Sequence, residues 1–208
     1  RRNQRIIMGP WTHPQAGNTP PGTTNAGDRD FGVVSLLDTR LIELAWFDRW
    51  LKGIDNGADR EPPVKRFVMG TNVWRDEQEW PLARTEWTPY YLHSDGHANT
   101  LHGDGTLTAS PPGDEPVDSY VYDPEHPVPT MGGCNCCNPE IVPWGVFDQR
   151  PVEVRDDVLV YTTTPLDHDL EVTGPILVHL FAATDGADTD FTAKLIDVFP
   201  DGTAWNLC

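Results

Sequence analysis

The pattern of apolar and polar positions changes near residue 85. Before that point a short apolar run in "RIIMG" is followed by a long polar loop, and a second apolar run, "VKRFVMG", comes later. Between the two runs, apolar side chains recur at spacings of three and four residues, which predicts a helix with one apolar face. These side chains are Leu37, Leu41, Leu44, Phe47 and Leu51. Strand, loop, helix and strand in this order indicate the closing unit of a parallel α/β sheet, with the second run pairing with the first.

The limits of the helix are marked by residues that favour helix ends. Ser35 with Asp38 predicts a capping box at the N-terminus, and Gly53 directly after Lys52 predicts the C-terminal end. The bulky Trp46 and Trp50 fall inside the helix, and we interpret them as core packing.

Beyond Trp87 the helical spacing disappears and short strand-like runs follow one another. Gly, Pro, Asp and Asn separate these runs, and "FPDGTAW" has the Pro-Asp-Gly turn of a β-hairpin. The runs are "TPYYLH", "DSYVYD", "DVLVYTT", "LEVTG", "PILVHLFAAT" and "DFTAKLIDVF". This pattern predicts an antiparallel β-sandwich, most simply a jelly roll, with a domain boundary near residues 81–88.

Composition narrows the function classes. The chain has 15 Lys and Arg against 32 Asp and Glu, a net charge of -17 that repels nucleic acids and anionic membranes. Its longest apolar run, "PILVHLFAA", is well short of the roughly 18 residues of a membrane span. We therefore expect no nucleic-acid partner and no membrane partner. No cofactor is expected either.

The chain ends and the cysteines carry further expectations. The chain starts at Arg1 without an initiator Met and stops inside the strand-like "GTAWNLC", so we expect both ends to be cut. Three of four cysteines crowd into "GGCNCCNPE", which is not a disulfide framework and favours a reducing compartment such as the cytoplasm. The C-x-C-C spacing is too tight for the usual zinc pattern, and a disulfide between adjacent cysteines would be strained. We expect neither.

A single histidine follows the first strand in "GPWTH". A side chain just past the end of a strand in an α/β sheet lies where ligands collect, and His13 there could act as a general base. The alternative is a loop histidine bonded to the backbone. Position by itself does not decide between them.

The segments around His13 add a resemblance. "GPWTH", "DRDFG", "FDRWLKG" and "RFVMGTNVWRDEQEWP" together resemble the cocaine-esterase (CocE/NonD) branch of serine hydrolases, which is related to X-Pro dipeptidyl-peptidases, α-amino acid ester hydrolases and glutaryl acylases. "YDPEHPVPTMGG", "FDQRPVEVRDDVLVYTT" and "LEVTGPILVHLFAATDGADTDFTAKLIDVFPDG" are similar to the C-terminal domain of that family. The resemblance implies that residues 1–82 are the C-terminal portion of an α/β-hydrolase domain. It implies that residues 83–208 are a jelly-roll β-sandwich of the X-Pro dipeptidyl-peptidase C-terminal, galactose-binding-like type, cut short at its C-terminus.

The same resemblance implies the site. The family uses a Ser-Asp-His triad in that chain order, and its histidine corresponds to His13. The serine and aspartate precede the histidine in the family, and no serine here stands in a G-x-S-x-G turn. We therefore expect the whole protein to cleave ester or amide bonds of small molecules or short peptides, and this chain alone to be inactive. The loop 133–144 is expected over the cleft, with Cys136 and Cys137 in the wall of the acyl pocket.

Two alternatives stay open. One is an X-Pro dipeptidyl-peptidase of the same family, because residues that would hold the substrate amine are not in this chain. The other is a non-catalytic carbohydrate-binding β-sandwich, which an exposed aromatic platform would favour and the strand–loop–helix unit argues against. The sequence does not indicate an oligomeric state.

Overall fold

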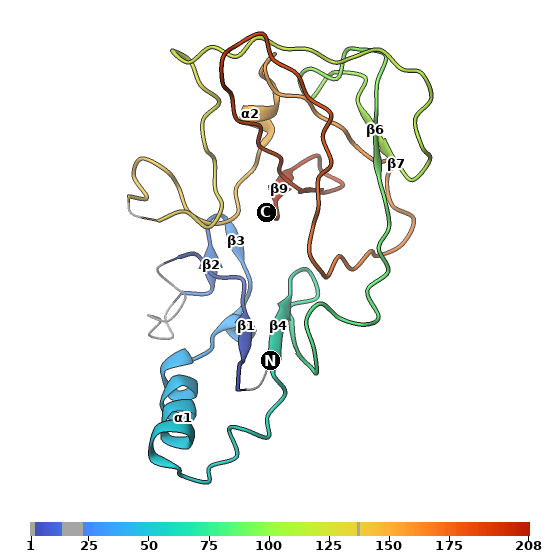
Figure 1. Ribbon diagram of the computed structural model, residues 1–208. Helices are drawn as coiled ribbons and strands as arrows, with labels where there is room; N and C mark the ends of the chain where they lie inside the picture. Colours follow the sequence, from blue (N-terminus) through green and yellow to red (C-terminus); the bar gives the residue numbers. More distant parts are fainter. Residues whose placement is uncertain (1–2, 14–22, 137) are drawn as a thin grey trace. The chain divides into compact units, whose positions relative to one another are not determined.

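The computed structural model describes residues 3–13, 23–136 and 138–208, and the chain divides into two compact units (Figure 1). Unit 1 comprises Arg1–Arg84 and Gly132–Phe147, and unit 2 comprises Thr85–Met131 and Asp148–Cys208. The elements in chain order are β1 (Ile6–Met8), β2 (Asn25–Ala26), β3 (Arg29–Asp30), the 3-10 helix η1 (Val33–Ser35), α1 (Thr39–Lys52), β4 (Val64–Val68), β5 (Val73–Glu77), β6 (Tyr91–His93), β7 (Thr106–Thr108), α2 (Arg150–Glu153), β8 (Ile196–Val198) and β9 (Ala204–Asn206).

Strands β1, β4 and β5 form the sheet of unit 1. β1 pairs with β4 in parallel, with Ile6 opposite Val64 and Met8 opposite Arg66, and β5 pairs with β4 antiparallel. Because parallel strands need a long crossover, the chain passes through α1 between them. The predicted pairing of the two apolar runs is confirmed. The described residues supply three strands of this sheet and do not form the complete sheet of an α/β-hydrolase.

Helix α1 begins at Thr39 rather than at Ser35. Asp38 is the N-cap, and its side chain accepts a hydrogen bond from Arg40 N at 3.1 Å. The Ser35 hydroxyl donates to Gly32 O at 2.8 Å inside η1, so the predicted capping box is wrong. A serine can bond to a nearby carbonyl in a tight turn as readily as it caps a helix. The predicted C-terminal end is confirmed, because Gly53 closes α1 with φ +70°.

The apolar face of α1 is exposed. Leu41 is 65% exposed and Leu51 77%. Trp46 and Trp50 contact each other with ring centroids 5.7 Å apart, but Trp50 is 39% exposed, so its interpretation as core packing is wrong. Spacing makes a helix amphipathic without supplying the surface that covers it, and no described element covers this face.

No helix in the described part of the chain has the length and apolar character to cross a bilayer.

An ion pair at Glu77 fixes the last strand of this sheet. Its carboxylate accepts hydrogen bonds from Arg84 Nη1 at 2.8 Å and from Arg66 Nη2 at 2.9 Å. The side chains of Arg66 and Glu77 are only 4% and 10% exposed. Hydrogen bonds from Arg84 and then Arg66 hold the pKa of Glu77 at about 2, against the opposing effect of burial. The pair therefore ties the segment that follows β5 back onto the sheet.

Unit 2 is built from short hairpins around a small core. β6 pairs with β7 and β8 pairs with β9, both antiparallel. Ala98, Val152 and Ala204 are buried at 0%, 5% and 2% exposure. The predicted hairpin at "FPDGTAW" is confirmed, with Gly202 at φ +84° in its turn.

Several predicted strands of unit 2 do not form. Segments 118–123, 170–174 and 175–184 have no strand pairing, and 157–163 makes isolated bridges only. Leu177 is 66% exposed and Phe181 fully exposed. A strand needs a neighbouring edge for its backbone hydrogen bonds and a surface against its apolar side chains, and the described residues supply neither here. The small sheets are consistent with a β-sandwich, but the described residues do not form a complete jelly roll.

Candidate functional site

His13 lies in a turn shortly beyond the C-terminal end of β1. The strand ends at Met8, Thr12 is buried at 6% exposure, and His13 itself is exposed. Its ring forms no hydrogen bond to another described residue. Thr12 is thus buried while the imidazole next to it is exposed to solvent.

An aromatic cluster packs around Trp11, two residues before the histidine. The Trp11 ring lies 5.6 Å from Trp74, which lies 5.2 Å from Phe67, which meets Phe31 edge to face at 6.1 Å. The indole nitrogens of Trp11 and Trp74 donate to carbonyl oxygens of segment 34–35 at 3.2 and 2.7 Å. Edge-to-face pairs and indole hydrogen bonds to the backbone restrict ring positions. The turn with the histidine therefore starts from a rigid base.

Two serine hydroxyls of the described chain, those of Ser35 and Ser94, are bonded within local structure. Ser35 is bonded inside η1, and Ser94 Oγ donates to Asp118 Oδ2 at 2.7 Å. Asp118 also accepts from Tyr161 Oη at 2.6 Å and from Ala98 N at 2.8 Å. Burial raises the pKa of Asp118, but the hydrogen bonds from Ser94, Tyr161 and Ala98 together outweigh it and lower the pKa. No serine hydroxyl in the described residues is hydrogen-bonded to a histidine ring. A serine without such a base is a weak nucleophile, so these serines are not activated.

His93 lies between a carboxylate and a hydroxyl, as the histidine of a triad does. It differs from a triad histidine in that both of its ring nitrogens face acceptors. Nδ1 lies 2.8 Å from Glu115 Oε1, while Nε2 lies 2.9 Å from Ser110 O and 3.1 Å from Thr108 Oγ1. A carboxylate and a carbonyl are both acceptors, so both ring nitrogens donate. The Glu115 hydrogen bond, followed by Ser110 O, raises the pKa of His93 against burial. With both nitrogens donating in this arrangement, neither is left to accept the proton of Thr108.

The pair of His93 and Glu115 predicts that the stability of unit 2 depends on pH. Because the pKa of His93 is raised in the folded state above its ordinary 6.5, its stabilisation is complete below that value and is lost as pH rises through the folded pKa. In the full-length protein, the melting temperature difference between wild type and His93→Gln should be larger at pH 5.5 than at pH 8.5. The exposed His102→Gln is the control. Equal differences at both pH values would contradict the pairing.

Residues 132–147 stand in the sequence between the two parts of unit 2 but fold with unit 1. We call this segment the excursion. The two ends of this excursion meet as an antiparallel bridge, with Gly133 N donating to Gly145 O at 2.6 Å. Val146 N donates to Ala26 O at 3.0 Å and Asp28 N to Val146 O at 2.8 Å, which joins the excursion to the turn between β2 and β3. Figure 1 shows it beside these two strands.

Gln149 follows the excursion in the chain and bonds to residues of its own unit, unit 2. It is 1% exposed, and its Nε2 donates to Met131 O at 3.0 Å and to Asn206 Oδ1 at 3.1 Å. Its Oε1 accepts from Lys194 Nζ at 2.9 Å, and burial lowers the pKa of that lysine. The segment "FDQRP" carries part of the family resemblance, but nothing in it predicts a role for Gln149. A lone polar residue in a turn carries no signal that it is buried.

The cysteines of the predicted pocket lie in the excursion. Cys134 and Cys136 are free and exposed, and Cys137 lies outside the described residues. In the described part of the chain, no three His, Cys, Asp or Glu residues are grouped as a metal site. The neighbouring Trp144 has a buried indole nitrogen without a hydrogen-bond partner in this structure.

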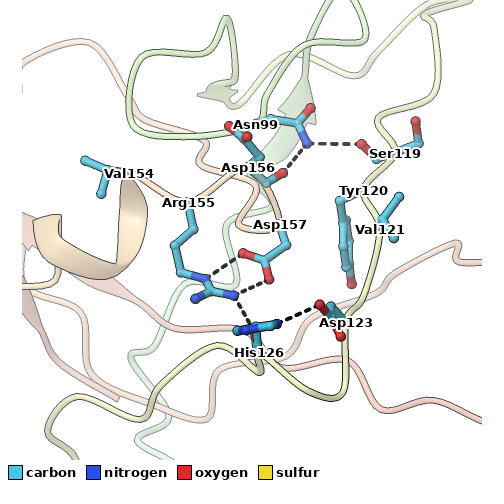
Figure 2. Close-up of a pocket in the computed structure, with 10 residues that line it drawn as sticks. All are labelled: Asn99, Ser119, Tyr120, Val121, Asp123, His126, Val154, Arg155, Asp156 and Asp157. Atoms are coloured by element: carbon cyan, nitrogen blue, oxygen red, sulfur yellow. Dashed lines mark hydrogen bonds and ion pairs between the residues drawn. The ribbon is translucent and has the colours of Figure 1, made fainter.

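A separate open pocket of about 600 Å³ lies within unit 2 (Figure 2). Ser119, Asp123 and His126 all line it, the residue types of a triad. Figure 2 shows that Ser119 lies beside Asn99, whereas His126 lies beside Asp123 and Arg155 at another end. His126 Nδ1 is 2.9 Å from Asp123 Oδ2, and its side chain is 77% exposed. The three residues do not form a relay.

The polar groups of this pocket mostly bind one another. Arg155 Nε donates to Asp157 Oδ1 at 2.7 Å and Nη2 to His126 O at 2.6 Å. Asn99 Nδ2 donates to carbonyl oxygens of Ser119 and Asp156 at 3.0 and 2.7 Å. The arrangement holds three chain segments together and leaves few groups for a ligand.

Comparison with known proteins shows the family to which the chain belongs. Residues 56–208, more than half of it, match the family described as "X-Pro dipeptidyl-peptidase C-terminal non-catalytic domain". The chain belongs to this family. It is also 44% identical to cocaine esterase of Rhodococcus sp. (strain MB1 Bresler) over 211 residues, 98% of this chain and 35% of that protein. The domain match, this identity and a match to a solved structure show that the chain is the C-terminal part of a CocE/NonD family member.

A solved structure of an α-amino acid ester hydrolase is similar to it as well. The TM-score is 0.55 with 27% sequence identity, covering 82% of this chain and 27% of that one. The chain thus spans about a third of the length of cocaine esterase and about a quarter of the solved structure. His13 lies before the residues matched to the non-catalytic domain, whereas Cys136 lies within them.

Proposed function

We propose that the protein containing this chain is a serine hydrolase that cleaves ester or amide bonds, with His13 as its general base. The observation that carries the proposal is the exposed histidine turn beyond β1, in a chain of the CocE/NonD family. The parallel pair β1–β4 with α1 between supports the finer assignment of residues 1–82 to an α/β-hydrolase domain. The small sheets of unit 2 support a jelly roll within residues 83–208, although residues 132–147 of that range fold with unit 1.

The chemistry follows from the weak acidity of a serine hydroxyl. At neutral pH it attacks an acyl carbon only if a base removes its proton as the bond forms. His13 accepts this proton during acylation and returns it to the leaving alcohol or amine; in deacylation it acts in the same way on water. An aspartate would fix the ring tautomer. We place the serine and the aspartate outside residues 1–208, so this chain alone is inactive.

The excursion 132–147 is proposed as one wall of the acyl pocket. Supporting observations are its folding with unit 1, which contains His13, and its attachment to the β2–β3 turn. Cys136 is exposed there and offers a small polarizable side chain to an acyl group. We propose Cys137 for the same wall from its sequence position.

Active-site labelling of the full-length protein tests this function. We expect a fluorophosphonate probe, which reacts with activated serines, to label one serine outside residues 1–208 and to abolish hydrolysis of p-nitrophenyl acetate. Alanine at that serine should prevent labelling. Labelling at Ser35, Ser94, Ser110 or Ser119, or no labelling of an active preparation, would contradict the proposal.

An X-Pro dipeptidyl-peptidase is the second candidate, favoured by the description of the matched domain family. The two candidates differ in leaving group and in recognition of a substrate amine. A kcat/KM for an Xaa-Pro p-nitroanilide above that for p-nitrophenyl esters would favour the peptidase. A carbohydrate-binding role is less supported, because the polar groups around Tyr120 in the unit 2 pocket are bound to one another.

A further inference from the structure

The excursion meets the turn between β2 and β3 at a contact between two glycines. Gly27, in the turn between β2 and β3, is bridged to Val146, and its neighbours Ala26 and Asp28 exchange the two hydrogen bonds with Val146 described above. Gly145 is buried against the same turn. Gly145 also closes the neck of the excursion through Gly133. One short stretch therefore determines both the closure of the loop and its place on the hairpin.

The contact depends on the absence of side chains. A Cβ on Gly145 would lie under 3.0 Å from the backbone nitrogen of Gly27, and a Cβ on Gly27 would lie 2.7 Å from Val146 N. Both glycines also have positive φ, +106° and +65°. Ordinary carbon contacts are about 3.5–4.0 Å, so a methyl group on either glycine must separate the two backbones by roughly 1 Å.

We propose that the Gly27–Gly145 contact positions the wall of the acyl pocket and thereby determines which acyl groups the enzyme accepts. The inference rests on the proposed hydrolase function. The loop that carries Cys136 has its neck at this contact, and the hairpin it rests on follows the His13 turn in the chain. Gly27 and Gly145 are positioning residues, since they act on substrate through the loop.

The expected consequence differs between acyl groups. A bulky acyl group reaches the wall and loses contacts when the wall moves, whereas an acetyl group is too small to reach it. A displacement of roughly 1 Å in a catalytic arrangement can cost about 100-fold in rate. We therefore expect kcat/KM for a benzoyl ester to fall about 10- to 100-fold in Gly145→Ala, and kcat/KM for an acetyl ester to change less than about 3-fold.

The experiment compares p-nitrophenyl benzoate and p-nitrophenyl acetate in the full-length enzyme. Gly145→Ala and Gly27→Ala each add a methyl group to the same contact, one from each side. Both should lower kcat/KM for the benzoyl ester selectively. Gly70→Ala is the matched control, because Gly70 has φ +87° but nothing within 4 Å of its Cβ position. It carries comparable backbone strain without moving the loop, and should leave the ratio of the two kcat/KM values unchanged.

The outcomes separate the positioning role from a structural role. The proposal would be overturned if Gly145→Ala and Gly27→Ala left the ratio of the two kcat/KM values unchanged, whether through equal losses or no loss. It would also be overturned if Gly70→Ala changed this ratio as much. If wild type neither reacts with fluorophosphonate nor hydrolyses either ester, the hydrolase function itself fails. If wild type does both and only the ratio is unaffected, the function stands and the positioning role fails.

A measurement on wild type covers the case in which the variants do not fold. Phenylboronic acid forms a tetrahedral adduct with activated serines and presents an aryl group to the acyl pocket. Its binding should slow amide hydrogen exchange at Val146 and Asp28, whose N–H groups hold the contact. Methylboronic acid should not. Equal protection by both, or by neither, would overturn the proposal.

Discussion

Alanine at His13 in the full-length protein should lower kcat for ester hydrolysis by roughly 10⁴-fold or more, with KM little changed. The imidazole is asked to move a proton in the transition state, and binding of the ground-state ester does not need it. Since His13 is exposed and bonded to no other described residue, its loss should leave the melting temperature unchanged. Steady-state kinetics with p-nitrophenyl acetate and a thermal scan of each protein measure both quantities.

The control for this variant is His102→Ala, which removes another exposed histidine without a proposed role. It should retain wild-type kinetics. His13→Ala should also lose most of its reactivity toward fluorophosphonate, because an unactivated serine is not labelled. A His13→Ala enzyme with more than a tenth of wild-type kcat would mean that another group is the base.

Removing the carboxylate of Glu77 should destabilise the domain that contains β5 by about 3 kcal/mol. The pKa of Glu77 is lowered from 4.5 to about 2, and each pKa unit corresponds to about 1.4 kcal/mol. Breaking a buried ion pair at one partner typically costs about 3–5 kcal/mol because the other charge is left without its partner. Arg84 is 59% exposed and partly screened by water, which favours the lower end. Urea unfolding of full-length Glu77→Ala, followed by tryptophan fluorescence, measures the loss.

Asp76→Ala is the matched control on the same strand. Its carboxylate pairs with Lys65 at 2.6 Å but is 47% exposed, so its loss should cost no more than about 1 kcal/mol. The pH dependence has a defined sign: a depressed carboxylate pKa stabilises fully above 4.5, and this stabilisation disappears as pH falls toward 2. The gap between wild type and Glu77→Ala should therefore narrow from pH 6 to pH 3. A gap that is constant over this range would contradict the ion-pair account.

Features set by neighbouring residues could be predicted from the sequence. Gly53 ends its helix because a left-handed residue satisfies the last carbonyls locally, and the Asp201–Gly202 turn is set within a few residues. The pairing of β1 with β4 is longer in range, but two apolar runs around one helix leave few arrangements. His13 was found through the motifs that surround it, since its position by itself fits an ordinary loop histidine.

Features that need a distant partner could not be predicted. The strand-like segment 175–184 is apolar enough for a strand, but its structure depends on which edge lies next to it. The residue type of Trp50 predicts burial, although burial depends on what covers the helix. The contact of Gly27 with Gly145 joins positions far apart in the sequence, and a glycine in a loop does not indicate which backbone approaches it.

The discontinuity of unit 1 has a consequence for biosynthesis. When the ribosome has released residues 1–84, it has released all three strands β1, β4 and β5, but not the segment 132–147 that bonds to the turn between β2 and β3. At roughly 5–20 residues per second, that segment emerges several seconds later. In the interval the Ala26 carbonyl and the Asp28 amide are hydrated. The nascent sheet therefore forms early and the hairpin acquires its partner late, so completion of unit 1 waits for translation of the first part of unit 2.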